Sequence, residues 1–241
     1  MKKKMIYREL VKYYDLIYLW KDYKKESNKI KKLILKYKKS DGNELLDVAC
    51  GTGKHLSYLK DNFSCTGVDT SKEMLSVARK NVKGVVFKKA DMVTLSLNKK
   101  FDVITCLFSS IGYIKTYSNL RKAIQNFAKH LKTGGILIIE PWFTKSTYRV
   151  GLPHITIYNG ENIKIARLNI SKIKGNISVM DMHYLIAEKN KDVKYFIDRH
   201  ELRLFEVDKT LEIMKEVGFQ TKFLKRGLMK NRGIYLGIKK L

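Results

Sequence analysis

From Glu44 onward the chain alternates short apolar runs with amphipathic stretches, and this alternation constrains the fold more than any other feature. Strands that alternate with helices build a parallel sheet covered by helices on both faces. The apolar runs lie at 44–49, 64–69, 85–91, 101–108 and 135–142, and helices are predicted at 54–61, 71–81 and 118–131. Thr133-Gly134-Gly135 is predicted to stop the last of these helices ahead of the fifth strand.

After Trp142 the pattern changes to alternating apolar and polar residues between turn signals, which is typical of antiparallel strands. Such segments span 154–160, 162–175, 176–188 and 193–205, after which a helix at 207–217 and strands at 218–224 and 233–240 complete the first pattern. The sequence therefore predicts an α/β fold with a Rossmann-like, mostly parallel sheet of about seven strands, finished by a hairpin. Residues 1–141 and 207–241 would form this domain, and 142–206 an inserted antiparallel β cap.

The N-terminal segment is predicted to be an amphipathic helix, because apolar residues from Tyr7 to Tyr18 recur at helical spacing. Charged residues such as Glu9 and Asp15 interrupt it, so it does not fit a signal peptide. A second helix is predicted at 29–38. No run is long enough to span a membrane. The three cysteines include no Cys-x-x-Cys pair, which favours a reducing cytoplasm and gives no metal site.

The charge is strongly basic, with 49 Lys and Arg against 23 Asp and Glu, a net +26. Such a surplus suits an anionic partner, either nucleic acid or a phosphorylated metabolite. Because the lysines are scattered through every segment, a compositional bias without functional meaning explains the surplus equally well.

The stretch LLDVACGTGKHLSYL, residues 45–59, predicts a strand, a glycine-rich turn and a helix. Ligands of open α/β sheets bind at the carboxyl ends of the strands, where glycine lets a ligand approach the backbone. A dinucleotide fingerprint requires Gly-x-Gly-x-x-Gly. A frame from Gly51 meets Leu56 at the third glycine, and one from Ala49 meets Lys54, so a nicotinamide cofactor is disfavoured.

The turn instead resembles the small-x-Gly-x-Gly loop of the class I S-adenosylmethionine-dependent methyltransferases, with Ala49, Gly51 and Gly53 in register after Asp47. The resemblance implies that Asp69, at the end of the second strand, accepts the ribose hydroxyls of S-adenosylmethionine. Asp91 and Met92 would contact the adenine. The cofactor-binding residues that the resemblance implies are Tyr14, Asp47, Ala49, Gly51, Gly53, Asp69, Thr70, Met74, Asp91, Met92 and Leu107, with Tyr14 on a helical lid.

Further segments, among them FDVITCLFSSIGY, EPWF, RHELRLF and NRGIYLG, resemble one subfamily over most of the chain: the dTDP-amino-sugar N,N-dimethyltransferases of the desosamine and mycaminose type. This resemblance implies a nucleotide-diphosphate amino sugar as substrate and a homodimer. It places Tyr113 beside the acceptor nitrogen and favours His183 over His200 as a catalytic residue. Trp142 and Tyr148 would stack on the substrate, and Arg232 would pair with its diphosphate. The loop before Arg232, MKN, departs from the small residues usual in the family.

Three functions remain open at this point. The first is N-methylation of a nucleotide-linked (dTDP) deoxyamino sugar, or of another small amine or hydroxyl acceptor. The second is RNA methylation, which the charge invites, although the sequence has no basic-aromatic platform and no Asn/Asp-Pro-Pro-aromatic signature. The third is cofactor binding without catalysis.

Overall fold

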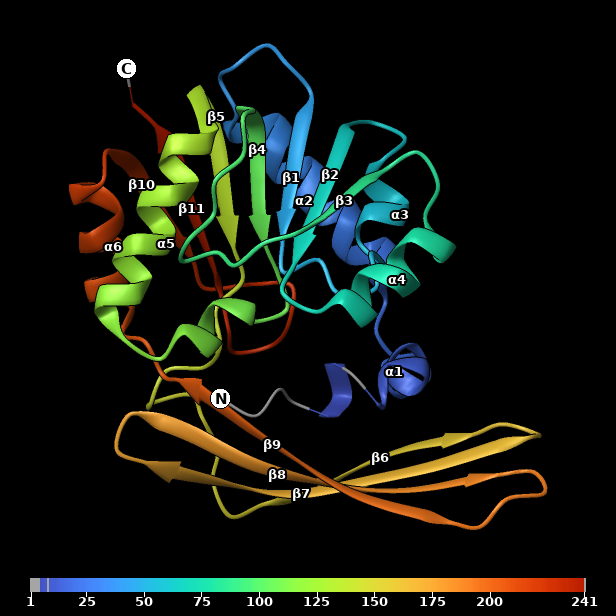
Figure 1. Ribbon diagram of the computed structural model, residues 1–241. Coiled ribbons are helices and arrows are strands. Elements are labelled where there is room, and N and C mark those ends of the chain that lie inside the picture. The colour runs from blue at the N-terminus through green and yellow to red at the C-terminus, as the bar shows by residue number, and fades with distance from the viewer. Residues whose placement is uncertain (1–4, 8, 241) are drawn as a thin grey trace.

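The computed structural model describes residues 5–7 and 9–240. Two sheets form separate layers, and helices pack around the larger one (Figure 1). The strands of the larger sheet are β1 (Glu44–Val48), β2 (Ser64–Asp69), β3 (Val86–Lys89), β4 (Phe101–Cys106), β5 (Leu131–Ile139), β10 (Phe219–Leu224) and β11 (Ile234–Lys239). Their order is β10-β11-β5-β4-β1-β2-β3, with β11 antiparallel to both of its neighbours. The predicted α/β fold and terminal hairpin are confirmed.

The central strands are apolar because both of their faces are covered. All six residues of β4 are buried, as a strand between two helical layers requires. The helices are α2 (Tyr23–Tyr37), α3 (Leu56–Leu59), α4 (Lys72–Asn81), α5 (Tyr117–His130) and α6 (Val207–Glu216). One core lies between the sheet and helices α5 and α6, and contains Phe101 of β4 and Phe127 of α5. The other lies between the sheet and helices α2 and α4, and contains Ile34 of α2 and Leu75 of α4.

Three helical boundaries differ from the sequence prediction. The helix after the glycine turn is one turn long, α3, instead of spanning 54–61. The helix predicted at 29–38 begins earlier, at Tyr23, because the Asp22 side chain caps it by accepting from the Lys25 N–H at 2.8 Å. The N-terminal segment is divided into the short helices η1 (Met5–Tyr7) and α1 (Val11–Ile17).

The helix stop predicted at Thr133–Gly135 is wrong. Helix α5 ends at His130, and Leu131 already pairs with Phe101 of β4. The glycines form an irregularity inside β5, where the register with β4 shifts. Gly134 has φ +75°, and its carbonyl accepts hydrogen bonds from the Lys39 and Ser40 N–H groups. The glycine pair therefore marks a strand bulge, which uses the same left-handed glycine conformation as a helix terminus.

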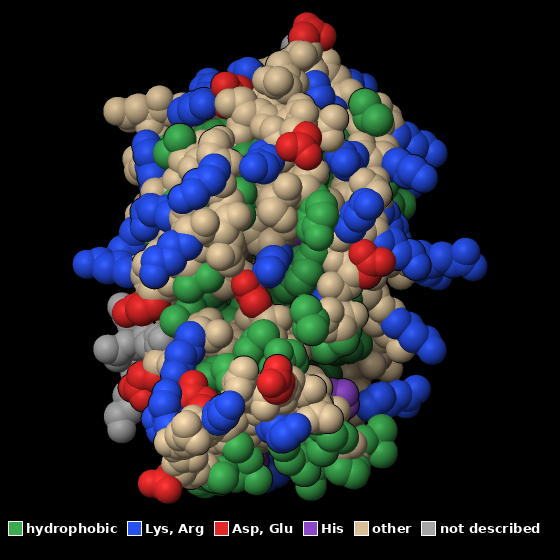
Figure 2. All heavy atoms as spheres, turned by 90° about the vertical axis from the view of Figure 1, so that its right-hand side faces the viewer, with side chains coloured by type: hydrophobic (Ala, Val, Ile, Leu, Met, Phe, Trp, Pro, Cys, Tyr) green, Lys and Arg blue, Asp and Glu red, His purple; other side chains and the backbone are tan. Residues whose placement is uncertain are grey.

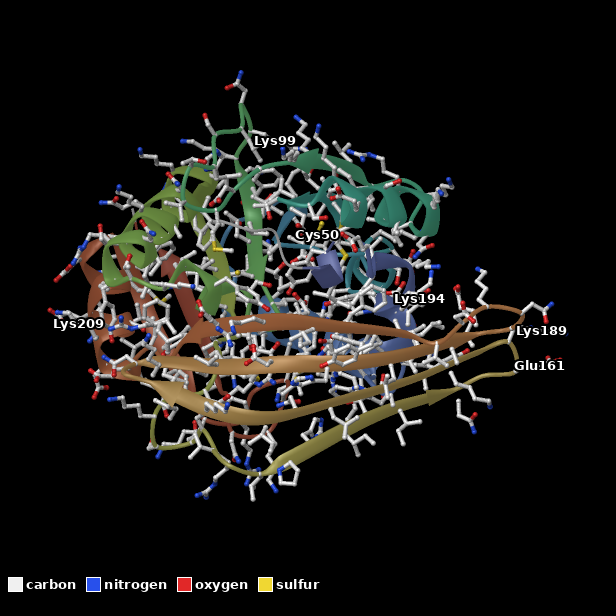
Figure 3. The ribbon with its side chains drawn as sticks, turned by 60° about the horizontal axis from the view of Figure 1, so that its bottom comes forward. Cys50, Lys99, Glu161, Lys189, Lys194 and Lys209 are labelled. Carbon is white, nitrogen blue, oxygen red and sulfur yellow. The ribbon has the colours of Figure 1, made fainter. Side chains whose placement is uncertain are left out.

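The second sheet contains β6 (Pro153–Asn159), β7 (Ile163–Lys174), β8 (Ile177–Glu188) and β9 (Lys194–Arg203), all antiparallel and in chain order. It lies across the end of the larger sheet at which β1, β2 and β4 terminate (Figure 1). Its β6–β7 and β8–β9 turns, marked by Glu161 and Lys189, extend together beyond the body of the molecule (Figure 3). Within the described ranges, no helix is long and apolar enough to cross a membrane.

Candidate active site

The glycine turn after β1 opens a space at the end of the sheet. Ala49, Gly51 and Gly53 all have positive φ, at +60°, +56° and +78°. A Cβ placed on Gly51 would meet nothing within 4 Å, whereas one on Gly53 would lie 3.2 Å from Val82 Cγ2. Gly51 therefore exposes backbone to a ligand, and Gly53 lets the turn pack against α4.

Two carboxylates stand beside this turn. Asp69, at the end of β2, accepts from the Gly51 N–H and the Ser71 N–H, each at 2.9 Å. Burial raises its pKa, and these N–H groups oppose that effect. Asp47, at the end of β1, accepts from the Thr105 hydroxyl at 2.7 Å, and burial raises its pKa to about 6. Carboxylates beside exposed backbone suit a ligand with hydroxyl and ammonium donors.

The turn and the end of β4 line one cavity, and Tyr14 of α1 covers it. Of the predicted cofactor-binding residues, the cavity lining includes Tyr14, Asp47, Ala49, Gly51 and Leu107. Its volume is about 40 Å³, whereas ligands of nucleoside size occupy pockets of roughly 300–1,000 Å³. Binding such a ligand therefore requires the residues that line the cavity to move apart.

The other predicted cofactor residues lie along the same edge. Asp91 and Met92 follow β3: Asp91 is exposed and accepts from the Val93 N–H at 2.8 Å, and Met92 packs against the core. Thr70 is exposed after β2, and Met74 is buried in the first turn of α4. Along the sheet these strands lie in the order β4-β1-β2-β3, so an extended ligand at this edge would meet Leu107 after β4, the glycine turn after β1, Asp69 at the end of β2 and Asp91 after β3.

Asp15 fastens α1 to the glycine turn, a contact that the sequence does not reveal. Its carboxylate accepts from the Thr52 hydroxyl at 2.7 Å and from the Asn81 amide at 3.3 Å, and it lies 3.4 Å from Lys54 Nζ. These bonds hold the covering helix closed over the cavity.

A cluster of hydrogen-bonded side chains lies between this end of the sheet and the second sheet. The Tyr113 hydroxyl lies 3.0 Å from the Tyr7 hydroxyl and 2.6 Å from His200 Nδ1. His200 Nε2 lies 2.9 Å from the Asp198 carboxylate. Asp198 and His200 are two residues apart on one strand, so both project from the inner face of the sheet, and this i, i+2 spacing is the signal that could have identified the pair.

His183 lies elsewhere, which corrects its sequence-based assignment. It pairs with Ile197 in β8 and β9, and its Nδ1 lies 2.6 Å from the Tyr195 hydroxyl. Ile197 and Tyr195 are about half exposed and belong to the outer face. Side chains alternate between the two faces of a sheet, and Ile197, the partner of His183, lies three residues before His200. His183 is therefore on the face opposite to His200. The position beside Tyr113 therefore belongs to His200.

Arg232 packs against an aromatic cluster near the end of β5. Its guanidinium lies 4.4 Å from the Trp142 ring centroid and 4.9 Å from that of Phe143, and it donates to the Ser109 hydroxyl at 3.0 Å. Tyr148 is buried against both aromatic rings. The Trp142 indole N–H donates to Ser178 of the second sheet at 2.8 Å. The three predicted substrate residues are thus brought together.

Glu140 is buried near this aromatic cluster and was not identified from the sequence. It is fully buried, and it accepts from the Phe108 N–H at 2.8 Å. Burial raises its pKa, and the nearby charge of Arg232 lowers it. Burial in turn lowers the pKa of Arg232. Each buried charge therefore compensates the other.

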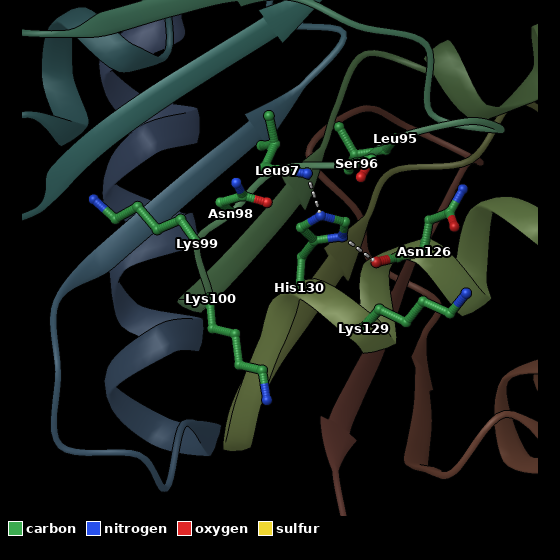
Figure 4. Close-up of a pocket in the computed structure, with 9 residues that line it drawn as sticks. All are labelled: Leu95, Ser96, Leu97, Asn98, Lys99, Lys100, Asn126, Lys129 and His130. Carbon is green, nitrogen blue, oxygen red and sulfur yellow. Dashed lines mark hydrogen bonds between the residues drawn. The ribbon is translucent and has the colours of Figure 1, made fainter.

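A larger surface hollow lies at the opposite end of the sheet, around His130 (Figure 4). The His130 ring accepts from the Leu97 N–H at 2.8 Å through Nε2, and its Nδ1 lies 2.7 Å from the Asn126 carbonyl. With both nitrogens bonded to backbone, His130 connects α5 to the preceding loop and has a structural role. In the described part of the chain, no group of three His, Cys, Asp or Glu residues is placed to hold a metal ion.

Comparison with known proteins gives consistent matches. A methyltransferase domain is matched over residues 45–135. The chain is 34% identical over 228 residues to the dTDP-3-amino-3,4,6-trideoxy-alpha-D-glucopyranose N,N-dimethyltransferase of Streptomyces venezuelae, covering 93% of this chain and 95% of that protein. The crystal structure of Streptomyces venezuelae DesVI superposes with a TM-score of 0.90 at 33% identity, covering 95% of this chain and 98% of that one. SAM-bound CalS10, an amino pentose methyltransferase from Micromonospora echinaspora, gives 0.82 at 26% identity, with 91% and 92% covered.

Proposed function

This chain belongs to the S-adenosylmethionine-dependent sugar N,N-dimethyltransferase family, and from that premise we propose that it methylates the amino group of a dTDP-linked deoxyamino sugar. The observation that carries the proposal is the match over nearly the full length of a dTDP-amino-sugar enzyme, which includes the second sheet as well as the common methyltransferase domain. The aromatic cluster beside Arg232 supports it, because a guanidinium beside aromatic rings suits a nucleoside diphosphate.

The cofactor supplies a methyl group that is already activated on a sulfonium, so the chain needs no nucleophile of its own. The donors and acceptors around Gly51 fit its polar groups, and Asp69 is positioned to accept from ribose hydroxyls. The remaining task of the protein is to orient the acceptor amine and exclude water, which supplies up to roughly 7–11 kcal/mol of barrier reduction in favourable cases. We propose that residues 142–206 act as a cap for this purpose and that α1 acts as the lid.

The experiment that tests this function is mass spectrometry of the protein incubated with S-adenosylmethionine and a panel of dTDP-3-amino and dTDP-4-amino sugars, with bulk RNA in parallel. A gain of one or two methyl masses on one sugar, with RNA unchanged, supports the proposal. Methylation of RNA alone would favour the rival function that the +26 charge suggests. Cofactor binding without any product would refute sugar methylation.

Removing the Asp15 carboxylate with Asp15→Ala is expected to accelerate both the binding and the release of S-adenosylmethionine. Both events require α1 to open, and each hydrogen bond lost is worth about 1 kcal/mol, so each rate should rise about fivefold or more. Stopped-flow fluorescence measures both rates, and Asp22→Ala, at the start of α2, is the matched control. Unchanged rates in Asp15→Ala would mean that α1 is not the gate.

We also propose that the protein is a cytoplasmic homodimer, joined through the outer face of the second sheet. All three cysteines are free thiols, as a reducing compartment favours. Hydrophobic side chains gather on this outer face, at the bottom of the molecule in Figure 2. Those that are at least 45% exposed are Ile155, Ile157, Leu168, Ile170, Leu185, Tyr195 and Ile197. Monomers rarely expose a contiguous apolar patch of this kind.

Placing a charge in the centre of the outer face with Leu185→Glu is expected to give a monomer. A buried carboxylate without a partner costs several kcal/mol, and a two-fold interface would contain it twice. Sedimentation velocity at micromolar concentration measures the mass, and Leu35→Glu, on exposed α2, is the control. A monomeric wild-type protein would refute the proposed dimer.

A further inference from the structure

The cluster beneath the cap has a fixed direction of hydrogen bonding. An ionised Asp198 can only accept, so His200 Nε2, 2.9 Å away, carries the proton. In the neutral ring Nδ1 is then an acceptor, and the Tyr113 hydroxyl donates to it at 2.6 Å. The Tyr113 oxygen in turn accepts from the Tyr7 hydroxyl at 3.0 Å. The chain of bonds therefore leads from Tyr113 through the imidazole to the carboxylate.

The charged end of this chain is shielded from solvent. The His200 and Asp198 side chains are only 7% and 3% exposed. Asp198 also accepts from the Ile6 N–H at 3.3 Å, so η1 fixes its position. Aspartate beside a histidine stabilises the imidazolium form and fixes the ring orientation, the arrangement that enzymes use to make a histidine accept a proton.

Three of the described groups face His200, and one of them is charged. They are Tyr7 from η1, Tyr113 from η2 (Ser110–Ile114) and Asp198 from β9. In the paired strand β8 its partner is Met180, which carries no charge. The adjacent Glu201 forms an ion pair with Lys115, so those two charges offset each other. Asp198 is therefore the anion that the described part of the chain places directly on the ring.

Tyr113 lies in η2, whose first residue lines the cavity at the end of β4. It follows Leu107, Phe108 and Ser110, which line the cavity at the end of β4. Its ring also lies close to Tyr7, with centroids 6.2 Å apart. Burial raises the pKa of the Tyr113 hydroxyl well above its ordinary value, so this hydroxyl stays protonated and transmits a proton without storing one.

We propose that Tyr113, His200 and Asp198 form a proton relay that deprotonates the acceptor nitrogen between the first and the second methyl transfer. When a neutral amine takes the first methyl group, a nitrogen–carbon bond forms and the carbon–sulfur bond breaks, with its electron pair going to sulfur. The nitrogen then carries one proton more than a neutral secondary amine. This proton passes to the Tyr113 oxygen while the Tyr113 proton passes to His200 Nδ1, leaving an imidazolium paired with Asp198.

The relay explains how one site can add two methyl groups. The nitrogen regains the lone pair that a second transfer requires, without release of the monomethylated sugar into water. Positioned acid–base groups contribute about 10²–10⁴-fold in rate. This inference rests on the proposed function and assigns the proton-accepting role to His200.

The first test follows the imidazole itself, without turnover. The protein, with ¹⁵N-labelled histidine, is saturated with S-adenosylhomocysteine and a monomethylated dTDP-3-amino sugar, and the His200 ring signals are assigned by their loss in His200→Asn. The amino sugar should convert His200 from the neutral Nε2–H form to the imidazolium, whereas the corresponding hydroxyl sugar should leave it neutral. A ring that stays neutral with the amino sugar bound would overturn the proposal.

The second test separates the two methyl transfers. In His200→Asn, whose amide oxygen still accepts from Tyr113, the second transfer should slow at least tenfold at pH 7, so that the monomethylated product accumulates. The rate should recover by pH 9, because hydroxide and buffer then remove the proton. The matched control is His154→Asn, the same change at an exposed histidine of β6, which should behave as wild type.

Two outcomes would contradict the relay. Equal slowing of both transfers at every pH would mean that His200 only positions Tyr113, and an unchanged product ratio would mean that water removes the proton. If His200→Asn does not fold, Tyr113→Phe removes the hydroxyl that passes the proton to His200. This variant should show the same accumulation of monomethylated product and the same recovery of rate with pH. Failure of the wild-type protein to methylate any sugar would instead refute the proposed function.

Discussion

Asp69→Asn is expected to weaken S-adenosylmethionine binding about 10- to 100-fold, and Asp69→Ala at least about 100-fold. Hydrogen bonds to charged groups contribute about 1.5–3 kcal/mol each, and we propose that Asp69 accepts two from the ribose. It also accepts from the Gly51 and Ser71 N–H groups, so it both shapes the turn and binds the ligand. Calorimetric titration with S-adenosylhomocysteine measures the change, and exposed Asp61→Asn should show none.

An analogue lacking the 2′-hydroxyl separates those two roles of Asp69. If the carboxylate contacts the ribose, wild type loses about tenfold in affinity for the deoxy analogue, while Asp69→Asn, which has already lost its anionic acceptor, loses much less. If Asp69 acts only by shaping the turn, the deoxy analogue costs both proteins the same. Equal losses would therefore remove Asp69 from the list of direct ligands.

The glycine turn and the strand ends could be predicted from the sequence because their signals are local. Apolar runs mark β1, β2 and β4, and the residue at each strand end follows from the length of the run. Since carboxyl ends of parallel strands meet at one edge, Asp47, Asp69 and Asp91 had to lie near each other once the sheet was recognised.

The inner face of the cap could not be predicted in the same way. Alternation shows that His183 and His200 project from opposite faces of one sheet only when the register between β8 and β9 is known. That register pairs His200 with Met180 and His183 with Ile197. Which face is covered then depends on η1 and η2, elements far away in the sequence.

Contacts between distant segments were lost for a similar reason. Asp15 lies 37 residues before Thr52. Glu140 follows β5, and the charge that acts on it belongs to Arg232, between β10 and β11. In the sequence Asp15 is only a charge that interrupts an apolar helix face. The Gly134-Gly135 pair illustrates the opposite failure, because it was interpreted as a helix stop, whereas the left-handed conformation of Gly134 belongs to a strand bulge.

Arg232→Lys is expected to raise the KM for the nucleotide sugar about 10- to 100-fold and leave cofactor affinity within about twofold. Lysine keeps the charge but loses the planar fork that binds a phosphate through two parallel bonds, and it stacks less well between Trp142 and Phe143. Steady-state kinetics measure KM, and exposed Arg226→Lys in the same C-terminal segment is the matched control. Binding of dTDP should weaken in Arg232→Lys while binding of thymidine should not. Equal weakening of both would show that Arg232 contacts the base or only supports the pocket.

Arg232→Met tests the structural role of the same residue, because it leaves the buried Glu140 without the charge of Arg232. Burial already keeps the proton on Glu140 to a higher pH in the folded chain than in the unfolded one, and removing Arg232 raises that pKa further. Folding then takes up a proton at Glu140, so stability is greatest in acid and falls as the pH rises through the folded pKa. Arg232→Met should therefore lose several degrees more in Tm at pH 8 than at pH 5, each relative to wild type.

Adding Glu140→Gln should abolish that pH dependence without restoring nucleotide-sugar binding, which separates the compensation of a buried carboxylate from the recognition of a diphosphate. A loss in Tm that is the same at both pH values would show that Glu140 does not depend on Arg232.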